Sequence, residues 1–193
     1  MSRDGRNCFV LTGGPGSGKS TLIEALGSVG FRTVPEAGRS IIREQVAISG
    51  RALPWIDPAL FAEMMLSRDL QSYERHAGHQ EVVFFDRGLP DVMGYLRLLD
   101  LPIPDHVRKA VDLHRYHPCV FICPPWPAIF TQDRERKQTR EEAELTYEAM
   151  IRVYSDCGYR LVEVPRAVVD DRRQFILDAI SGELCGSAPI PRC

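Results

Sequence analysis

The sequence lacks the features of a membrane or secreted protein. None of its hydrophobic runs approaches the roughly eighteen residues that a membrane-spanning helix needs, and its first residues contain no apolar stretch like that of a signal peptide. Its net charge of −2 gives no overall field that would attract nucleic acid or an anionic lipid surface. We therefore expect a cytoplasmic protein with neither a membrane nor a nucleic-acid partner.

Lysine is scarce, because only Lys19, Lys109 and Lys137 occur in a chain that is otherwise rich in arginine. None of the three stands in the N-K-x-D motif that reads guanine, so a guanine-specific switch is disfavoured. The six cysteines form no C-x-x-C pair, and three of them lie in or beside apolar runs that predict strands. We expect free thiols in a reducing compartment.

What the sequence does contain is the composition of a soluble globular domain, with 44% hydrophobic and 26% charged residues. A length of 193 residues fits one such domain and is sufficient to bury a core. We expect a flexible N-terminus over residues 1–7, a domain over 8–182 and a flexible tail over 183–193.

Residues 8–21, CFVLTGGPGSGKST, carry the strongest functional signal. An apolar run leads into G-x-x-x-x-G-K-S and a helical pattern follows, which is the context that a P-loop requires and a chance glycine-rich turn lacks. In a P-loop, backbone N–H groups surround the phosphates of ATP, the lysine reaches the β- and γ-phosphates, and the serine hydroxyl binds Mg²⁺. We expect Ser20 to bind the metal, and the nucleotide to be bound by Gly13, Gly14, Pro15, Gly16, Ser17, Gly18, Lys19, Ser20 and Thr21.

Further apolar runs alternate with segments of helical spacing. The runs predict strands over residues 31–34, 81–86, 120–123 and 160–164. Spacing and capping signals predict a short helix capped by Ser40, a long helix from Asp57-Pro58, and helices over 91–99, 105–115, 139–158 and 170–182. This alternation predicts a doubly wound α/β domain with five parallel strands.

Glu36 and Arg39 follow directly after the predicted second strand. Ligands of open parallel sheets bind at the carboxyl ends of the strands, so both residues are candidates for substrate binding. Glu36 could also take the proton from an attacking hydroxyl group. The alternative is a helix-capping acid beside a solvated arginine.

Asp86 ends the strand-like run EVVFFD, where the Walker B aspartate of a P-loop protein is expected. We expect it to hold Mg²⁺ together with Ser20. The alternative is an exposed acid in a turn. Arg87 follows, whereas mechanical ATPases usually have a glutamate at that place and small-molecule kinases often have Asp-Arg.

The segment DRERKQTR over residues 133–140 packs four cations into seven positions. It follows the fourth predicted strand and precedes a helix that Thr139 and Glu142 can cap. We expect a lid whose Arg134 and Arg136 fold onto the triphosphate. The alternative is a solvated charge run.

Together, GGPGSGKST, PEAGR, FFDRG, and PPW followed by DRERKQT resemble the NadR/Ttd-type AAA domain family over roughly residues 7–182. This family of P-loop proteins includes the ribosylnicotinamide kinase domain of NadR and is related to the nucleoside and thymidylate kinases. The resemblance implies a three-layer P-loop sandwich with a lid and strand order 2-3-1-4-5. It also implies Asp86 near Mg²⁺, Arg134 or Arg136 on the phosphates, and Glu36, Arg39 and Arg87 toward the acceptor. The adenylyltransferase domain of NadR has no room in this sequence, so the substrate of NadR is not carried over.

These observations favour a small-molecule kinase that moves the γ-phosphoryl group of ATP to a nucleoside-like or related acceptor. Lys19, Mg²⁺ and the lid arginines would neutralise charge during transfer. A nucleotide switch that hydrolyses ATP or GTP slowly and acts through a partner remains the alternative. A mechanical ATPase is disfavoured by Asp86-Arg87 and by the lack of a C-terminal helical domain. The sequence leaves open which molecule is the acceptor and whether the chain forms a homodimer.

Overall fold

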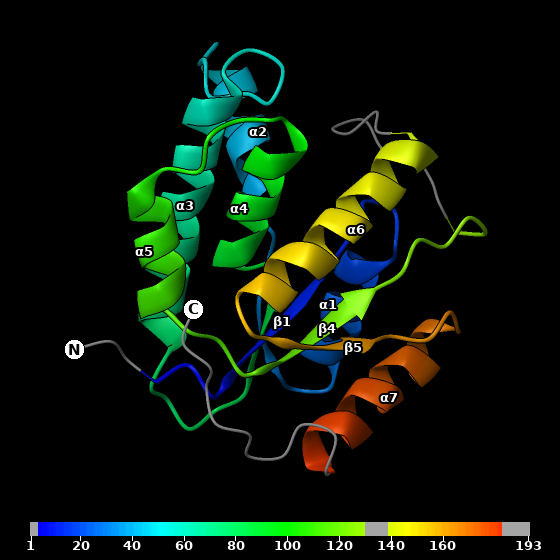
Figure 1. Cartoon of the computed structure of the whole chain (residues 1–193). Helices are drawn as coiled ribbons and strands as arrows, with labels where there is room; N and C mark the ends of the chain where they lie inside the picture. Colours follow the sequence, from blue (N-terminus) through cyan, green and yellow to red (C-terminus); the bar gives the residue numbers. More distant parts are fainter. Residues whose placement is uncertain (1–3, 130–138, 183–193) are drawn as a thin grey trace.

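Five short strands form one parallel sheet in the computed structural model, which describes residues 4–129 and 139–182 (Figure 1). The strands are β1 (Cys8–Gly13), β2 (Arg32–Val34), β3 (Val83–Asp86), β4 (Cys119–Cys123) and β5 (Arg160–Glu163). Their order across the sheet is β2-β3-β1-β4-β5. The predicted α/β P-loop fold with strand order 2-3-1-4-5 is therefore confirmed.

Helices cover both faces of this sheet, which makes three layers. They are α1 (Lys19–Ser28), α2 (Ala37–Ala47), α3 (Pro58–His76), α4 (Leu89–Leu98), α5 (Asp105–Leu113), α6 (Arg140–Asp156) and α7 (Val169–Ser181). Helices α1 and α7 pack on one face, and α3, α4, α5 and α6 pack on the other, as Figure 1 shows for α6 and α7.

Strand β1 lies at the centre of the sheet and is buried along its whole length. Because side chains alternate along a strand, Cys8 and Val10 pack toward α3, α4 and α6, whereas Phe9 and Leu11 pack toward α1 and α7. A strand buried on both faces reads as a continuous apolar run, which is why the sequence indicated it clearly.

The register of the sheet brings the candidate residues to one edge. Leu11 of β1 pairs with Asp86 of β3, and Val34 of β2 pairs with Phe85. The P-loop, Asp86 and the start of α2 therefore follow three neighbouring strands at their carboxyl ends. This is the edge at which open α/β sheets bind ligands.

The local helix signals were mostly correct. Asp57 caps α3, since the N–H of Leu60 donates to its Oδ1 at 3.1 Å. Thr139 and Glu142 form the predicted capping box at the start of α6. The prediction for Ser40 was wrong: α2 begins at Ala37, and the Ser40 hydroxyl donates to the carbonyl oxygen of Ala37 at 2.8 Å. A serine within the first turn can satisfy its hydroxyl in this way without capping the helix.

Residues 4–7, which the sequence predicts to be loose, are attached to the domain. Gly5 forms a parallel bridge with Tyr116, and the side-chain amide of Asn7 donates to the carbonyl oxygens of His76 and Glu81. The bridge and the two side-chain hydrogen bonds of Asn7 attach this short segment to the domain. The predicted tail, residues 183–193, lies outside the described residues.

The cysteines only partly match the expectation of free thiols. Cys8, Cys123 and Cys157 form no disulfide and are buried, and burial raises the pKa of the Cys8 thiol to about 12, with a smaller effect of Asp4. Cys119 is disulfide-bonded, so the expectation is wrong at that position. None of the helices in the described ranges is long and apolar enough to cross a membrane.

Candidate functional site

The P-loop connects β1 to α1, and its glycines are required by the backbone. Gly18 has a φ of 77°, in the left-handed region that glycine adopts without strain. A Cβ atom on Gly14 would lie 2.2 Å from the carbonyl oxygen of Ala143 in α6. The loop therefore packs closely against α6, and a larger residue at position 14 would push the two apart.

Lys19 is the buried cation of this loop, with only 5% of its surface exposed. Its Nζ donates to the carbonyl oxygens of Gly14 at 2.7 Å and Gly13 at 3.1 Å, and it lies 3.3 Å from the hydroxyl of Ser17. Neither a capping side chain nor an acidic residue occupies the first turn of α1. The positive end of the helix and the lysine charge therefore face the same concave loop, which suits a phosphate.

Ser20 and Asp86 meet beside the loop. The Ser20 hydroxyl donates to Oδ2 of Asp86 at 3.1 Å, and the Asp86 side chain is 5% exposed. Its other oxygen, Oδ1, is buried and has no hydrogen-bond partner among the described residues. A hydroxyl and an unsatisfied carboxylate oxygen are hard oxygen donors, which fit Mg²⁺.

The described residues contain no cluster of three or more histidine, cysteine or acidic side chains that could hold a metal by itself. Mg²⁺ commonly takes one or two protein ligands and completes its shell with water and substrate phosphates. The pair of Ser20 and Asp86 beside a phosphate-binding loop fits that pattern.

A cavity of about 680 Å³ lies over the P-loop and is called here the P-loop pocket. Besides the loop itself, it is lined by Glu36, Arg39, Trp126 and Arg172 among others. Arg172, in the first turn of α7, donates from Nη2 to the carbonyl oxygen of Ser17 at 3.0 Å and packs 5.7 Å from the centre of the Trp126 ring. Sequence reasoning missed this contact, because α7 is about 150 residues from the loop that it contacts.

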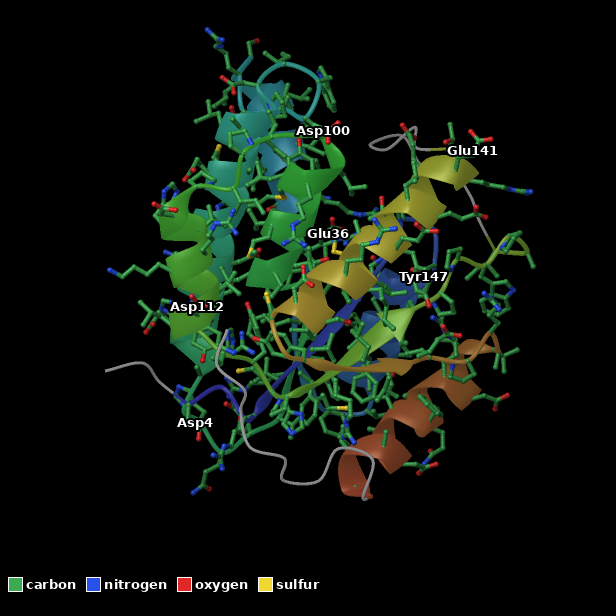
Figure 2. All side chains as sticks on the ribbon, in the orientation of Figure 1. Asp4, Glu36, Asp100, Asp112, Glu141 and Tyr147 are labelled. Carbon is green, nitrogen blue, oxygen red and sulfur yellow. The ribbon has the colours of Figure 1, made fainter. Side chains whose placement is uncertain are left out.

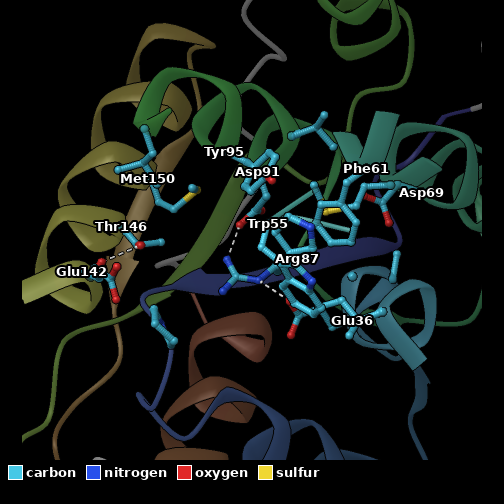
Figure 3. A pocket seen from close by; sticks show the side chains of 18 residues that line it. Glu36, Trp55, Phe61, Asp69, Arg87, Asp91, Tyr95, Glu142, Thr146 and Met150 are labelled. Carbon is cyan, nitrogen blue, oxygen red and sulfur yellow. Dashed lines mark hydrogen bonds and ion pairs between the residues drawn. The ribbon is translucent and has the colours of Figure 1, made fainter. Parts of the chain in front are cut away.

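Glu36, Arg39 and Arg87 are brought together at the start of α2. Nε of Arg87 donates to Oε1 of Glu36 at 3.1 Å (Figure 3). Nε of Arg39 lies 3.5 Å from Oε2 of the same carboxylate. Figure 2 shows Glu36 inside the domain, whereas Asp100 and Asp112 lie at its surface. A buried carboxylate between two guanidinium groups is held in one orientation.

Arg87 itself adopts an unusual backbone conformation, with a φ of 75°. Left-handed conformations of residues other than glycine cost about 1–3 kcal/mol and are common at functional sites. Burial opposes the positive charge of this arginine, but Asp91 and Asp86 outweigh that effect and raise its pKa further. Arg87 therefore stays charged inside the protein.

Asp91, which the sequence did not indicate, anchors this arginine. Its two oxygens accept four hydrogen bonds, from Nη1 of Arg87 at 2.8 Å, the Thr12 hydroxyl at 2.8 Å, the Tyr154 hydroxyl at 2.6 Å and the N–H of Gly88 at 3.0 Å. With both oxygens occupied, Asp91 fixes the position of Arg87 and has little capacity left for a ligand.

A second cavity, of about 540 Å³, opens on the other side of Glu36 and is called here the Trp55 pocket (Figure 3). Its walls come from α2, α3, α4, α6 and the segment that precedes α3. Glu36 and Pro15 line both cavities. The two cavities therefore adjoin at the carboxylate of Glu36.

A family model described as an AAA domain matches residues 8–172, which is most of the chain. The chain belongs to this family. No curated protein matches the sequence significantly.

Solved structures share the fold of this AAA-domain chain. NadR in complex with NR matches 97% of the chain with a TM-score of 0.67 at 19% identity, and the chain spans about half (54%) of that protein. Deoxyadenosine kinase from M. mycoides matches 90% of this chain and 98% of its own, with a TM-score of 0.64 at 15% identity. Shikimate kinase from Aquifex aeolicus matches 93% of this chain and 99% of its own, with a TM-score of 0.53 at 17% identity. At these identities the likeness shows the fold alone.

Asp69, on α3, is a further carboxyl group of the Trp55 pocket in this AAA-domain chain. Burial raises its pKa to about 8; the nearby Asp91 adds to this effect and Arg87 offsets part of it. Asp69 stands four positions after Met65 and four before Tyr73, within the apolar stripe of the helix. An acid at helical spacing in such a stripe is a signal that sequence reasoning could have used.

Arg134 and Arg136, predicted to reach the phosphates from a lid, lie outside the described residues.

Proposed function

We propose that the chain is a Mg²⁺-dependent kinase that transfers the γ-phosphoryl group of ATP to a hydroxyl group of a nucleoside-like small molecule. The observation that carries this proposal is the position of Glu36, which lines both the P-loop pocket and the Trp55 pocket. A carboxylate where two cavities adjoin can contact a hydroxyl group in one and lie near the γ-phosphate in the other. A protein that only hydrolyses nucleotide needs no second cavity at this place.

On the donor side, the backbone of residues 13–21 would bind the phosphates, and Lys19 would leave the loop carbonyls for the β- and γ-phosphate oxygens. Ser20 and Asp86 would hold the metal ion. When bound, Mg²⁺ would supply positive charge that offsets the charge of the phosphates during transfer. We further propose that Arg134 and Arg136 close over the phosphates during transfer.

On the acceptor side, Glu36 would accept the proton of the attacking hydroxyl group. The hydroxyl oxygen then forms a bond to the γ-phosphorus, while the bond to the β–γ bridging oxygen breaks and ADP leaves. Arg87, fixed by Asp91, would keep Glu36 in the orientation that this step needs. Arg39 lines the P-loop pocket. We therefore place it on the phosphate side of the site, not with the acceptor as the sequence suggested.

The test is to incubate purified protein with Mg-ATP and a panel of nucleosides and to measure both ADP and phosphorylated product by mass spectrometry. We expect at least one nucleoside to gain one phosphate group, with one ADP formed for each. ADP release at the same rate with every nucleoside, and without a phosphorylated product, would favour the nucleotide switch instead. The proposal includes no membrane or nucleic-acid partner, places the reaction in the cytoplasm, and holds for a monomer or a homodimer.

A further inference from the structure

Acidic side chains outnumber basic ones in the lining of the Trp55 pocket. Among the described residues that line it, Glu36, Asp69, Asp91 and Glu142 are acidic, and Arg87 is the only cation. Arg87 already forms ion pairs with Glu36 at 3.1 Å and with Asp91 at 2.8 Å. A phosphate or carboxylate group on a molecule in this pocket would therefore meet more negative than positive charge.

The walls of the pocket are aromatic and aliphatic. Phe61 and Tyr95 pack edge to face with their ring centres 5.5 Å apart, and Met65 and Met150 add apolar surface. Trp55 also lines the pocket, yet 60% of its surface is exposed. An exposed tryptophan at the mouth of an apolar cavity is a surface on which a flat ring can stack.

Two polar groups in this apolar pocket lack partners among the described residues. The hydroxyl of Tyr95 is buried without a hydrogen bond, and burial raises its pKa to about 12, so it remains a donor. The carboxyl group of Asp69, a half-buried residue, forms no hydrogen bond or ion pair within the described part of the chain, in contrast to the fully occupied Asp91. A buried polar group such as the Tyr95 hydroxyl is rarely left unpaired unless a ligand or water pairs with it.

We propose that the Trp55 pocket binds an unphosphorylated nucleoside, whose ring stacks on the aromatic side chains while Asp69 and the Tyr95 hydroxyl bind the polar edge of the ring. Asp69 is thus a residue that determines acceptor specificity. This inference rests on the proposed kinase function, because it assigns the acceptor class of the same site.

The protonation state of Asp69 determines which edge of the nucleoside ring it can hydrogen-bond. With a pKa of about 8, caused by burial and by Asp91, its carboxyl group is mostly protonated at neutral pH. A protonated carboxyl group donates one hydrogen bond and accepts another. An amino group beside a ring nitrogen, or a carboxamide, offers the matching pair of one donor and one acceptor.

Binding can be measured without ATP, because the chain has only two tryptophans and each lines a different cavity. In a Trp126→Phe background, Trp55 is the only tryptophan that reports ligand binding. The probes are adenosine, cytidine, uridine and nicotinamide riboside, together with the 5′-monophosphate of each. We expect at least one nucleoside to change Trp55 emission, and its monophosphate to bind at least about tenfold more weakly.

The variants Asp69→Leu and Tyr95→Phe keep the approximate side-chain shape and remove the polar groups. We expect each to weaken binding of the preferred nucleoside by about tenfold or more, and Asp69→Leu also to alter the order of preference among the nucleosides. Glu63→Gln, an exposed acid on the same helix, is the matched control and should bind like the parent protein. Circular dichroism establishes that each variant is folded.

Three outcomes would overturn the inference: no nucleoside binds, the monophosphates bind as tightly as the nucleosides, or the two pocket variants keep both affinity and preference. Failure of the kinase proposal looks different. If nucleosides bind with the expected dependence on Asp69 but none is phosphorylated, the kinase proposal fails and the ligand class stands. If a nucleoside is phosphorylated and the variants bind it normally, the kinase proposal stands and the role of Asp69 is refuted.

Discussion

Nε of Arg87 donates a hydrogen bond to Oε1 of Glu36 over 3.1 Å, and this bond joins the end of β3 to the start of α2. Glu36 lies where the P-loop pocket and the Trp55 pocket adjoin. Arg87 is held in turn by Asp91, so the orientation of Glu36 depends on a chain of buried ionic contacts. The proposed proton acceptor is therefore positioned before either substrate binds, which lowers the entropic cost of reaching a reactive geometry.

Replacement of Lys19 tests the donor side. Lys19→Ala removes the buried cation of the loop, so we expect turnover to be lost and Mg-ATP affinity to fall by at least about tenfold. Isothermal titration calorimetry and an ADP assay measure the two effects. Lys109→Ala, which changes an exposed lysine on α5, is the control. Normal ATP affinity and turnover in Lys19→Ala would refute nucleotide binding by this loop.

Replacement of Asp86 tests the metal assignment. Asp86→Asn removes the negative charge of the carboxylate whose Oδ1 oxygen is unpaired in the described structure. Mg²⁺ should then bind more weakly, so the Mg²⁺ concentration needed for half-maximal rate should rise by about tenfold or more. The measurement is a Mg²⁺ titration of the initial rate at saturating ATP. An unchanged Mg²⁺ dependence in a folded variant would remove Asp86 from the metal site.

Replacement of Glu36 should give the opposite pattern. Glu36→Gln keeps the shape of the side chain but cannot accept the proton, so kcat should fall by about 10²- to 10⁴-fold. The affinity for Mg-ATP and the Mg²⁺ dependence should stay near those of the parent protein. A fully active Glu36→Gln beside an Asp86→Asn that is inactive at saturating Mg²⁺ would move the base assignment to Asp86.

Replacement of Asp91 tests the buried ionic contacts themselves. Asp91→Ala leaves the Arg87 guanidinium and the hydroxyl groups of Thr12 and Tyr154 without their common acceptor. Removal of one partner from a buried ion pair costs about 3–5 kcal/mol, so thermal or urea unfolding should show a loss of that size. Asp156→Ala, which removes the exposed partner of Arg97, should change stability by less than about 1 kcal/mol. Similar losses in the two variants would contradict this prediction.

The sequence could predict those parts of the site whose residues lie within the P-loop or directly at the ends of strands. The P-loop is contiguous, and Asp86 and Glu36 end or follow apolar strands, whose carboxyl ends meet at one edge of a parallel sheet. Their proximity thus follows from the α/β pattern alone.

That the other residues meet at one site could not be predicted, because helices distant in sequence bring them together. Trp55, Asp69 and Tyr95 come from separate segments that converge only through the packing of α2, α3 and α4. Arg172 reaches the loop from α7. Which faces of these helices meet depends on side-chain packing across the whole domain, and a helical period alone leaves that open.

The titration of Asp69 should make the stability of the protein depend on pH. Its pKa is raised from an ordinary 3.8 to about 8, mainly by burial and further by Asp91, with Arg87 acting against the shift. The folded protein therefore binds more protons than the unfolded chain between about pH 4 and pH 8, and the stability from this group falls as pH rises through that range. Asp91, Arg87 and Tyr116 are described ionisable groups that interact with it, Glu36 lines the same pocket, and all four are present in parent and variant alike.

Asp69→Asn removes this titration, so the melting temperature of the variant should exceed that of the parent protein by an amount that grows with pH. We expect a difference near zero at pH 4.5 and a gain of at least about 3 °C at pH 8.5, where the parent carries a poorly solvated carboxylate. Differential scanning fluorimetry across this range measures the difference, and Gln71→Ala, an exposed residue of the same helix without an ionisable side chain, should show no such trend. A difference that is constant with pH would mean that Asp69 is ionised in the folded protein at all these pH values, as an ordinary solvated acid would be.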